Sequence, residues 1–387
     1  MKNLKSNLFA KIWLPALISS ITVFYFISFF NIDIAVPDFF YDADTPRTLL
    51  YVSEPRSAIS SIRPFLFFVS WVSNLFIEFL HPYSAWCILN VICIIIQIIC
   101  VKYILGKFSI PLRSISFVLT NLSILSWTLV PDTFILGITF FMLSIVLYGD
   151  GSVTYRVFLS GIIAASLNIF FVLPWIIAHL YLGKKTLVLS FWKALPPMFA
   201  VITMILSTQY LQKFKPPTPN EELQGSIQAI KPLVHFPFSN HSGIFSSVDS
   251  MGWFHSPFLG TAKNLLSFFT APWTQGYNYV PGIPAIYSDL LPLLILLLAT
   301  LLTFMSFLGL FIMKNQYRVF VSFIFSLEVA TCFLFLTYST HPYLFSPFLC
   351  VGRISGLIFV AGRFEKTFFP LVLISGILTV SSLQFMP

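Results

Sequence analysis

The stretch YSAWCILNVICIIIQIICVKYI, residues 83–104, decides the fold class of this chain. Its one charged residue is Lys102, near its end, and it is long enough to cross a bilayer, which takes about 17 to 25 helical residues. The rest of the chain has the same character, because 57% of its 387 residues are apolar and only 9% are charged, against roughly 25% in soluble domains. We therefore predict an all-α polytopic membrane protein that forms one membrane domain over residues 1–387.

Apolar runs of similar length recur along the whole chain. The run 173–183 is short, and we expect it to share a turn at Pro174 with the run before it. The first run follows Lys2 and Lys5, as in a signal peptide, but it is too long for one and ends without a small-x-small cleavage site, so it should remain as the first helix. In total we expect about eleven transmembrane helices, at residues 8–30, 83–104, 112–130, 132–149, 155–172, 173–183, 187–209, 287–313, 317–338, 344–361 and 367–385.

The run 65–80 determines the side on which every later loop lies. Polar residues interrupt it, as in an amphipathic helix at the membrane surface. With this run at the surface and the N-terminus in the cytoplasm, the outer turns near Asp132, Pro174 and His341 carry no Lys or Arg, as the positive-inside rule requires. The C-terminus is then outside, and the basic residues that fall in the cytoplasm are Lys2, Lys5, Lys11, Lys102, Lys107, Arg113, Arg156, Lys184, Lys185, Lys193, Lys314, Arg318, Arg363 and Lys366.

Two of the outer loops are large, at residues 31–82 and about 209–286. We expect the first to hold juxtamembrane amphipathic helices. The second is rich in Pro, Gly, Ser and Asn but keeps the aromatic stretches GWFHSPFLG, residues 252–260, and FFTAPWTQGYNY, residues 268–279. Such stretches predict short helices that lie on the membrane surface rather than a free linker.

The charge and cysteine patterns exclude several classes of function. The net charge is +8, but the basic residues are scattered between apolar runs, so nucleic acid is not an expected partner. The five cysteines all lie inside apolar runs and are expected to pack in the core. The chain contains no Walker A, GxGxxG or CxxC motif and no tandem repeat, which counts against ATP-driven transport and soluble cofactor chemistry.

One short stretch gathers charge directly after the first predicted helix. DFFYDADTPRTLLY, residues 38–51, holds three carboxylates and one arginine. At the outer membrane surface such a cluster can bind a divalent cation, or supply a general base whose pKa rises with desolvation. The alternative interpretation is an ordinary solvated start of a loop.

Five segments follow one another along the chain in a recognisable order. They are the first-loop acidic motif DADTPRTL (42–49), the juxtamembrane segment RPFLFFVSWVSNLF (63–76), the cytoplasmic turn KYILGKFSIPLR (102–113), the second outer acidic site VPD (130–132) and the late loop HPYLFSPFLCVG (341–352). Their order and sidedness together resemble the GT-C superfamily of integral-membrane glycosyltransferases. Two positions depart from the family pattern, since Thr45 stands where an acidic residue is common and Arg63 where His or Lys is usual.

The resemblance implies transfer of a sugar from a polyprenyl-phosphate carrier to a lipid, glycan or protein acceptor on the extracytoplasmic side. It implies Asp44 as the catalytic base, with Asp42 as second choice, and these two carboxylates as the ligands of any divalent cation. No cofactor is certain. Membrane lipids surround the protein, and a bacterial inner membrane is favoured over the endoplasmic reticulum. The residues implied to contact substrate are Arg47, Arg63, Asp132, His341, Tyr343 and Arg353.

Four of these residues have a structural alternative. Asp132 follows a proline at a short turn, where an Asp is often a helix N-cap. Glu328 and Arg353 each fall near the middle of a predicted span, where a lone charge costs at least about 2.5 to 3.5 kcal/mol. These two can form a structural ion pair, or Arg353 can face the carrier phosphate. His341 and Tyr343 are also ordinary interfacial residues.

Two other classes of protein stay open. An O-antigen-polymerase-like or ligase-like protein has a similar number of spans and one large outer loop, but its essential Arg and His are expected in that loop, whereas Arg is absent between Arg156 and Arg318. A secondary transporter needs midplane sites on broken helices, for which Pro196 and Pro197 are candidates together with the intramembrane charges.

Overall fold

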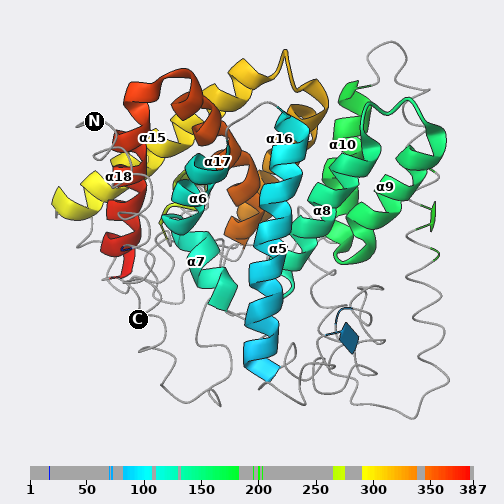
Figure 1. The fold of residues 1–387 in the computed structure, drawn as a ribbon, viewed down its shortest axis with the longest axis horizontal. Helices are drawn as coiled ribbons and strands as arrows, with labels where there is room; N and C mark the ends of the chain where they lie inside the picture. The colour runs from blue at the N-terminus through cyan, green and yellow to red at the C-terminus, as the bar shows by residue number, and fades with distance from the viewer. Residues whose placement is uncertain are drawn as a thin grey trace.

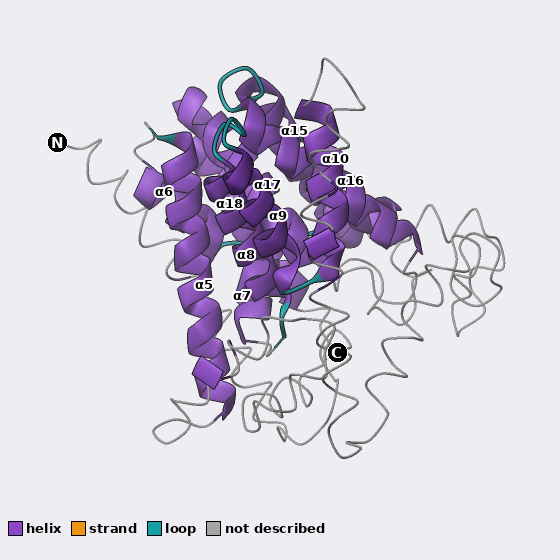
Figure 2. Cartoon of the chain, turned by 90° about the vertical axis from the view of Figure 1, so that its right-hand side faces the viewer, coloured by secondary structure: helices purple, strands orange, loops and turns teal. Residues whose placement is uncertain are grey.

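The computed structural model describes residues 82–106, 110–129, 132–182, 265–274, 290–337 and 345–383, together with a few isolated positions. Every regular element in these ranges is a helix, as predicted, and the helices pack side by side into one bundle (Figures 1 and 2). The predicted spans 8–30 and 187–209 and the predicted amphipathic run 65–80 lie almost wholly outside the described residues.

Three described helices are long and apolar enough to cross a membrane. The exposed face of the first of them is apolar, with isoleucines at positions 88, 92, 95 and 99 that are about half exposed. This spacing forms one stripe along a helix, and hydrocarbon is the solvent that such a stripe requires. The sequence prediction of these helices is confirmed to within a few residues for α5 (Pro82–Leu105), α15 (Leu290–Met313) and α16 (Arg318–Thr337).

The predicted span 112–130 is divided into two helices, α6 (Ile110–Leu119) and α7 (Leu122–Leu129). The Asn121 side-chain oxygen accepts the backbone N–H of Ile124 at 3.0 Å, which caps α7. The carbonyl of Thr120 accepts the hydroxyls of Ser375 at 2.9 Å and Thr379 at 2.5 Å. Both donors lie on α18 (Glu365–Leu383), so a neighbouring helix satisfies the backbone at the break.

A pair of short helices follows α8 (Phe134–Tyr148): α9 (Thr154–Ser166) and α10 (Val172–Leu182). The expected turn at Pro174 is wrong, because this proline lies inside the first turn of α10, where proline is tolerated. The chain instead reverses at 167–171, where the Asn168 side chain accepts the N–H of Phe170 at 2.9 Å. The reversal lies beside the middle of α8, since Phe171 stacks on Phe141 with ring centroids 5.0 Å apart.

The most deeply buried helix is α17 (Ser346–Arg363), whose residues are buried from Ser346 to Ala361. It crosses α15 at close range, because a Cβ on Gly356 would overlap the backbone of Ser306. A Cβ on Gly352 would likewise overlap the side chain of Ile324 on α16. Small residues at helix crossings let backbones approach closely, and here they bring both neighbours against α17.

The bundle has two ends, and they carry different side chains. At one end the Tyr317 hydroxyl donates to the carbonyl of Leu105 at 3.0 Å, and Lys314 lies 5.8 Å from the centre of the Tyr181 ring. This end, the basic end, joins the C-terminus of α5, the C-terminus of α10 and the turn between α15 and α16.

At the other end the indole N–H of Trp86 donates to the carbonyl of Asp132 at 3.1 Å. Beside it, the ring of Phe134 packs edge-on against Phe345 and Phe348, with centroids 6.1 and 5.4 Å apart. The starts of α5, α8 and α17 therefore meet at the end opposite to the basic end.

Candidate functional site

The structure describes two of the eight residues predicted to act on substrate, Asp132 and Arg353. Asp132 lies at the start of α8, whereas Arg353 lies two turns into α17, about 10 Å along that helix at 1.5 Å per residue. The predicted residues that lie outside the described part of the chain are Asp42, Asp44, Arg47, Arg63, His341 and Tyr343.

Asp132 is buried, with 4% of its surface exposed. Its carboxylate accepts the backbone N–H of Thr133 and, at 3.3 Å, the hydroxyl of the same residue. Thr133 is the N-cap residue of α8, so Asp132 precedes the cap instead of forming it, which corrects the N-cap interpretation. Its position at the N-terminus of α8 nevertheless favours the negative charge, because the helix dipole is positive there.

The predicted proximity of Glu328 and Arg353 is confirmed. The Arg353 Nε donates to Glu328 Oε1 at 3.2 Å, and Nη2 donates to Oε2 at 2.9 Å. Arg353 is fully buried and Glu328 is 4% exposed. The missing side chain of Gly352 allows the approach of α16 that makes this two-point contact possible. A planar guanidinium fits a carboxylate in this way, whereas a lysine ammonium would not.

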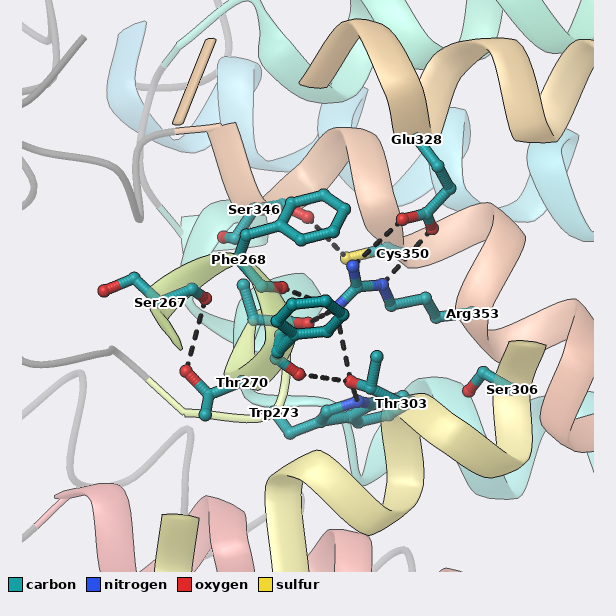
Figure 3. A network of polar contacts seen from close by, with 12 residues as sticks. Ser267, Phe268, Thr270, Trp273, Thr303, Ser306, Glu328, Ser346, Cys350 and Arg353 are labelled. Carbon is teal, nitrogen blue, oxygen red and sulfur yellow. Dashed lines mark hydrogen bonds and ion pairs between the residues drawn. The ribbon is translucent and has the colours of Figure 1, made fainter. Parts of the chain in front are cut away.

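The remaining nitrogen of the guanidinium faces a segment distant in sequence. Arg353 Nη1 donates to the carbonyl of Phe268 at 2.8 Å, to the carbonyl of Ala271 and to the hydroxyl of Thr303 at 3.2 Å (Figure 3). The guanidinium carbon also lies 4.7 Å from the centre of the Phe268 ring and 5.5 Å from that of Phe307. One buried arginine thus connects α15, α16 and α17 with residues 265–274, which we call the inserted segment.

The inserted segment is helical from 265 to 270 and continues as a turn to 274. Its aromatic stretch was expected on the membrane surface, yet Phe268, Ala271 and Trp273 are at most 5% exposed and pack within the bundle. The indole N–H of Trp273 donates to the Thr303 hydroxyl at 3.0 Å. Aromatic residues predicted an apolar partner correctly, but their pattern does not distinguish lipid from the interior of the protein.

A cluster of small polar residues surrounds the break between α6 and α7. The hydroxyls of Ser123 and Ser346 are 2.6 Å apart, and the Cys350 thiol lies 3.7 Å from the Asn121 side-chain oxygen. We did not predict this cluster, although a signal was present in Thr120 and Asn121, two adjacent polar residues in the middle of an apolar run.

An apolar pocket lies beside this cluster, between α5, the break and α17. Its free volume is about 30 Å³, which is room for a small group only. The lining residues are Ile94, Gln97, Ile98, Val101, Val118, Ile124, Val351, Ile354, Ser355 and Ile358.

Within the described ranges, no group of three or more His, Cys, Asp or Glu side chains could hold a metal ion. No protein-family model matches the chain, and comparisons with curated proteins and with solved structures found no match. The described residues therefore define an almost entirely helical protein with three helices able to span a membrane.

Proposed function

We propose that this chain is a glycosyltransferase of the bacterial inner membrane, which moves a sugar from a polyprenyl-phosphate carrier to an acceptor on the extracytoplasmic side. The observation that supports the proposal is the contact of Phe134 with Phe345 and Phe348. It brings the turn that carries Asp132 to the start of α17, next in sequence to the late loop with His341 and Tyr343.

The charges at the opposite end of the bundle support the same orientation. Lys314 and Arg318 lie there beside the end of α10, and Lys102 lies in the last turn of α5. By the positive-inside rule this end faces the cytoplasm, and the end with Asp132 faces outward. The acidic turn and the late loop then share the side on which the first outer loop lies in our topology.

In the proposed reaction Asp44 accepts the proton of the acceptor hydroxyl as this oxygen attacks the anomeric carbon of the sugar. The bond from that carbon to the carrier phosphate breaks, and arginine side chains stabilise the negative charge that develops on the phosphate. Arg47 and Arg63 are the candidates for this role. Asp42 orients the acceptor or binds a divalent cation.

The test is transfer of labelled sugar by the purified full-length protein from a panel of polyprenyl-phosphate donors, with and without chelator. Asp44→Asn keeps the shape but removes the base, so it should lower turnover by about 10² to 10⁴ while donor binding stays near normal. Asp38→Asn, in the same loop, is the matched control and should remain active. Near-normal turnover of Asp44→Asn would overturn the assignment of the base, and an inactive wild-type protein across the panel would overturn the proposed reaction.

One observation favours a secondary transporter as the second candidate. The break at Thr120 and Asn121 places polar side chains and helix ends inside the bundle, as in transporters with discontinuous helices. Substrate flux into proteoliposomes without any sugar transfer would support the transporter over the enzyme.

A further inference from the structure

The inserted segment depends on the bundle for its backbone hydrogen bonds. Two of its carbonyls have partners within the segment itself. The Ser267 carbonyl accepts the N–H of Ala271 at 2.9 Å, and the Thr270 carbonyl accepts the N–H of Trp273 at 3.0 Å. The other four carbonyls between 267 and 272 accept from the bundle: Phe268 and Ala271 from Arg353, Phe269 from the Thr303 hydroxyl at 2.5 Å, and Pro272 from the N–H of Ser123 at 3.3 Å.

A short helix leaves its last carbonyls without partners inside the helix. At the membrane surface water would satisfy them, but inside a membrane protein irregular backbone is stable only where protein groups take the place of water. The segment can therefore remain buried only while donors from α7, α15 and α17 reach it. Arg353 alone supplies two of the four external hydrogen bonds.

Arg353 can serve two carbonyls because Glu328 holds the other edge of its guanidinium. The two-point ion pair uses Nε and Nη2, which leaves Nη1 aimed at the segment. The ring of Phe268, 4.7 Å from the guanidinium carbon, covers one face of the same group. Most of these contacts go to backbone atoms of the segment, so they fix its position independently of most of its side chains.

We propose that Arg353, oriented by Glu328, is a latch that keeps the inserted segment in the bundle, and that the segment leaves the bundle as a unit when these donors are lost. Residues 265–274 lie in the later part of the large predicted outer loop, about 209–286, so the latch sets whether this part of the loop is embedded among the helices or lies at the surface. This device does not depend on the proposed reaction, because it follows from the hydrogen bonds of the segment alone.

The experiment uses a cysteine reporter at Ser267, which is 2% exposed and whose hydroxyl has no hydrogen-bond partner among the described residues. Ser267→Cys therefore removes no hydrogen bond made by that side chain. The full-length protein in native membranes is treated with a membrane-impermeant maleimide, and modification of residue 267 is measured by mass spectrometry, so that the native cysteines do not interfere. In the otherwise unchanged protein the reporter should be protected.

Two threonines of α15 give a matched pair of variants. The Thr303 hydroxyl donates to the segment, whereas that of Thr300 donates at 2.8 Å to Leu296 in its own helix. Thr303→Val should raise the labelling rate by about tenfold, as expected when a buried carbonyl loses its donor, and Thr300→Val should leave it unchanged. Arg353→Met should raise the rate further. Arg353→Lys keeps the positive charge but loses the planar guanidinium that makes the two-point contact. Its labelling rate should lie between those of the parent protein and Arg353→Met.

The proposal is overturned if residue 267 is labelled equally in the parent protein and in Thr303→Val, or if Thr300→Val raises labelling as much as Thr303→Val. Size-exclusion chromatography and circular dichroism show whether each variant remains folded. If Arg353→Met does not fold, the labelling of Thr303→Val still tests the proposal, because this variant leaves the ion pair intact. Sugar transfer is not part of the readout, so failure of the proposed reaction and failure of the latch are distinguishable.

Discussion

Arg353 and Glu328 form a two-point ion pair between α17 and α16, with nitrogen–oxygen distances of 3.2 and 2.9 Å and almost no exposed surface. The pair is neutral as a unit, whereas either charge by itself would lie uncompensated in the interior of the bundle. Burying two ions costs desolvation free energy that their attraction offsets only when both are present.

The first prediction follows from this asymmetry. Arg353→Met should lower the free energy of unfolding by about 3 to 5 kcal/mol because it leaves a buried carboxylate unpaired, and adding Glu328→Leu should recover part of the loss. Denaturant unfolding in detergent measures both. A double variant no more stable than the single one would show that the stranded carboxylate is not the main cost. Normal binding of the lipid-linked donor by the folded double variant would exclude a contact between Arg353 and the carrier phosphate.

The second prediction concerns the crossing of α15 and α17. In Gly356→Ala the new methyl group meets the backbone of Ser306, which cannot turn away. Overpacking of a core typically lowers the free energy of unfolding by about 1 to 3 kcal/mol, and we expect this variant to lie at or above the upper end of that range. Gly137→Ala is the comparison, because its methyl group meets the ring of Phe171, and a ring can move more easily than backbone. Thermal unfolding should rank Gly356→Ala as clearly the less stable variant, and the reverse order would refute the close crossing.

The third prediction concerns the break between α6 and α7. Ser375→Ala combined with Thr379→Val removes both hydroxyls that donate to the carbonyl of Thr120. The double variant should therefore have a free energy of unfolding that is lower by about 1 to 3 kcal/mol. The control is Thr367→Val, since the Thr367 hydroxyl donates to Phe364 near the start of the same helix, in an exposed position. Equal unfolding temperatures for the double variant and the control would show that the break does not need these donors.

The fourth prediction concerns orientation. Cysteines introduced at Ser53 and Ser239 should react with an impermeant reagent from outside intact cells, because both lie in the predicted outer loops. Cysteines at Ser109 and at Ser152, the latter exposed in the turn between α8 and α9, should react only after permeabilisation. Reaction of Ser109→Cys from outside would mean that the run 65–80 spans the membrane and would reverse every later loop.

The long helices were predictable because the membrane determines their length. An apolar run such as that of α15 needs no knowledge of its neighbours to be recognised, since bilayer thickness sets the number of residues. The break at Thr120 and Asn121 was missed for the opposite reason. It is stable because Ser375 and Thr379, which are more than 250 residues away in sequence, reach its free carbonyl.

The candidate site was predictable to the same limited extent. A charge in a predicted span requires a partner, and only a small number of acidic residues were available, so the proximity of Glu328 and Arg353 followed from the sequence. The contacts of Arg353 with Phe268 and Ala271 did not, because every residue has the same carbonyl group. Which carbonyls need an external donor depends on where the short helix ends in three dimensions.

The hairpin of α9 and α10 starts and returns at the basic end, and its lengths of about 20 and 17 Å are well short of a hydrocarbon core of about 30 Å. Near its tip Leu173 is 43% exposed, so the tip presents apolar surface to its surroundings. Such hydrophobic mismatch is relieved by local thinning of the bilayer. Lipids of the leaflet opposite the basic end should therefore bend towards the hairpin, and their head groups should lie closer to the middle of the membrane there than around α5. The bilayer around this protein should therefore be asymmetric in thickness, and lipids with shorter chains should collect on the side of the hairpin.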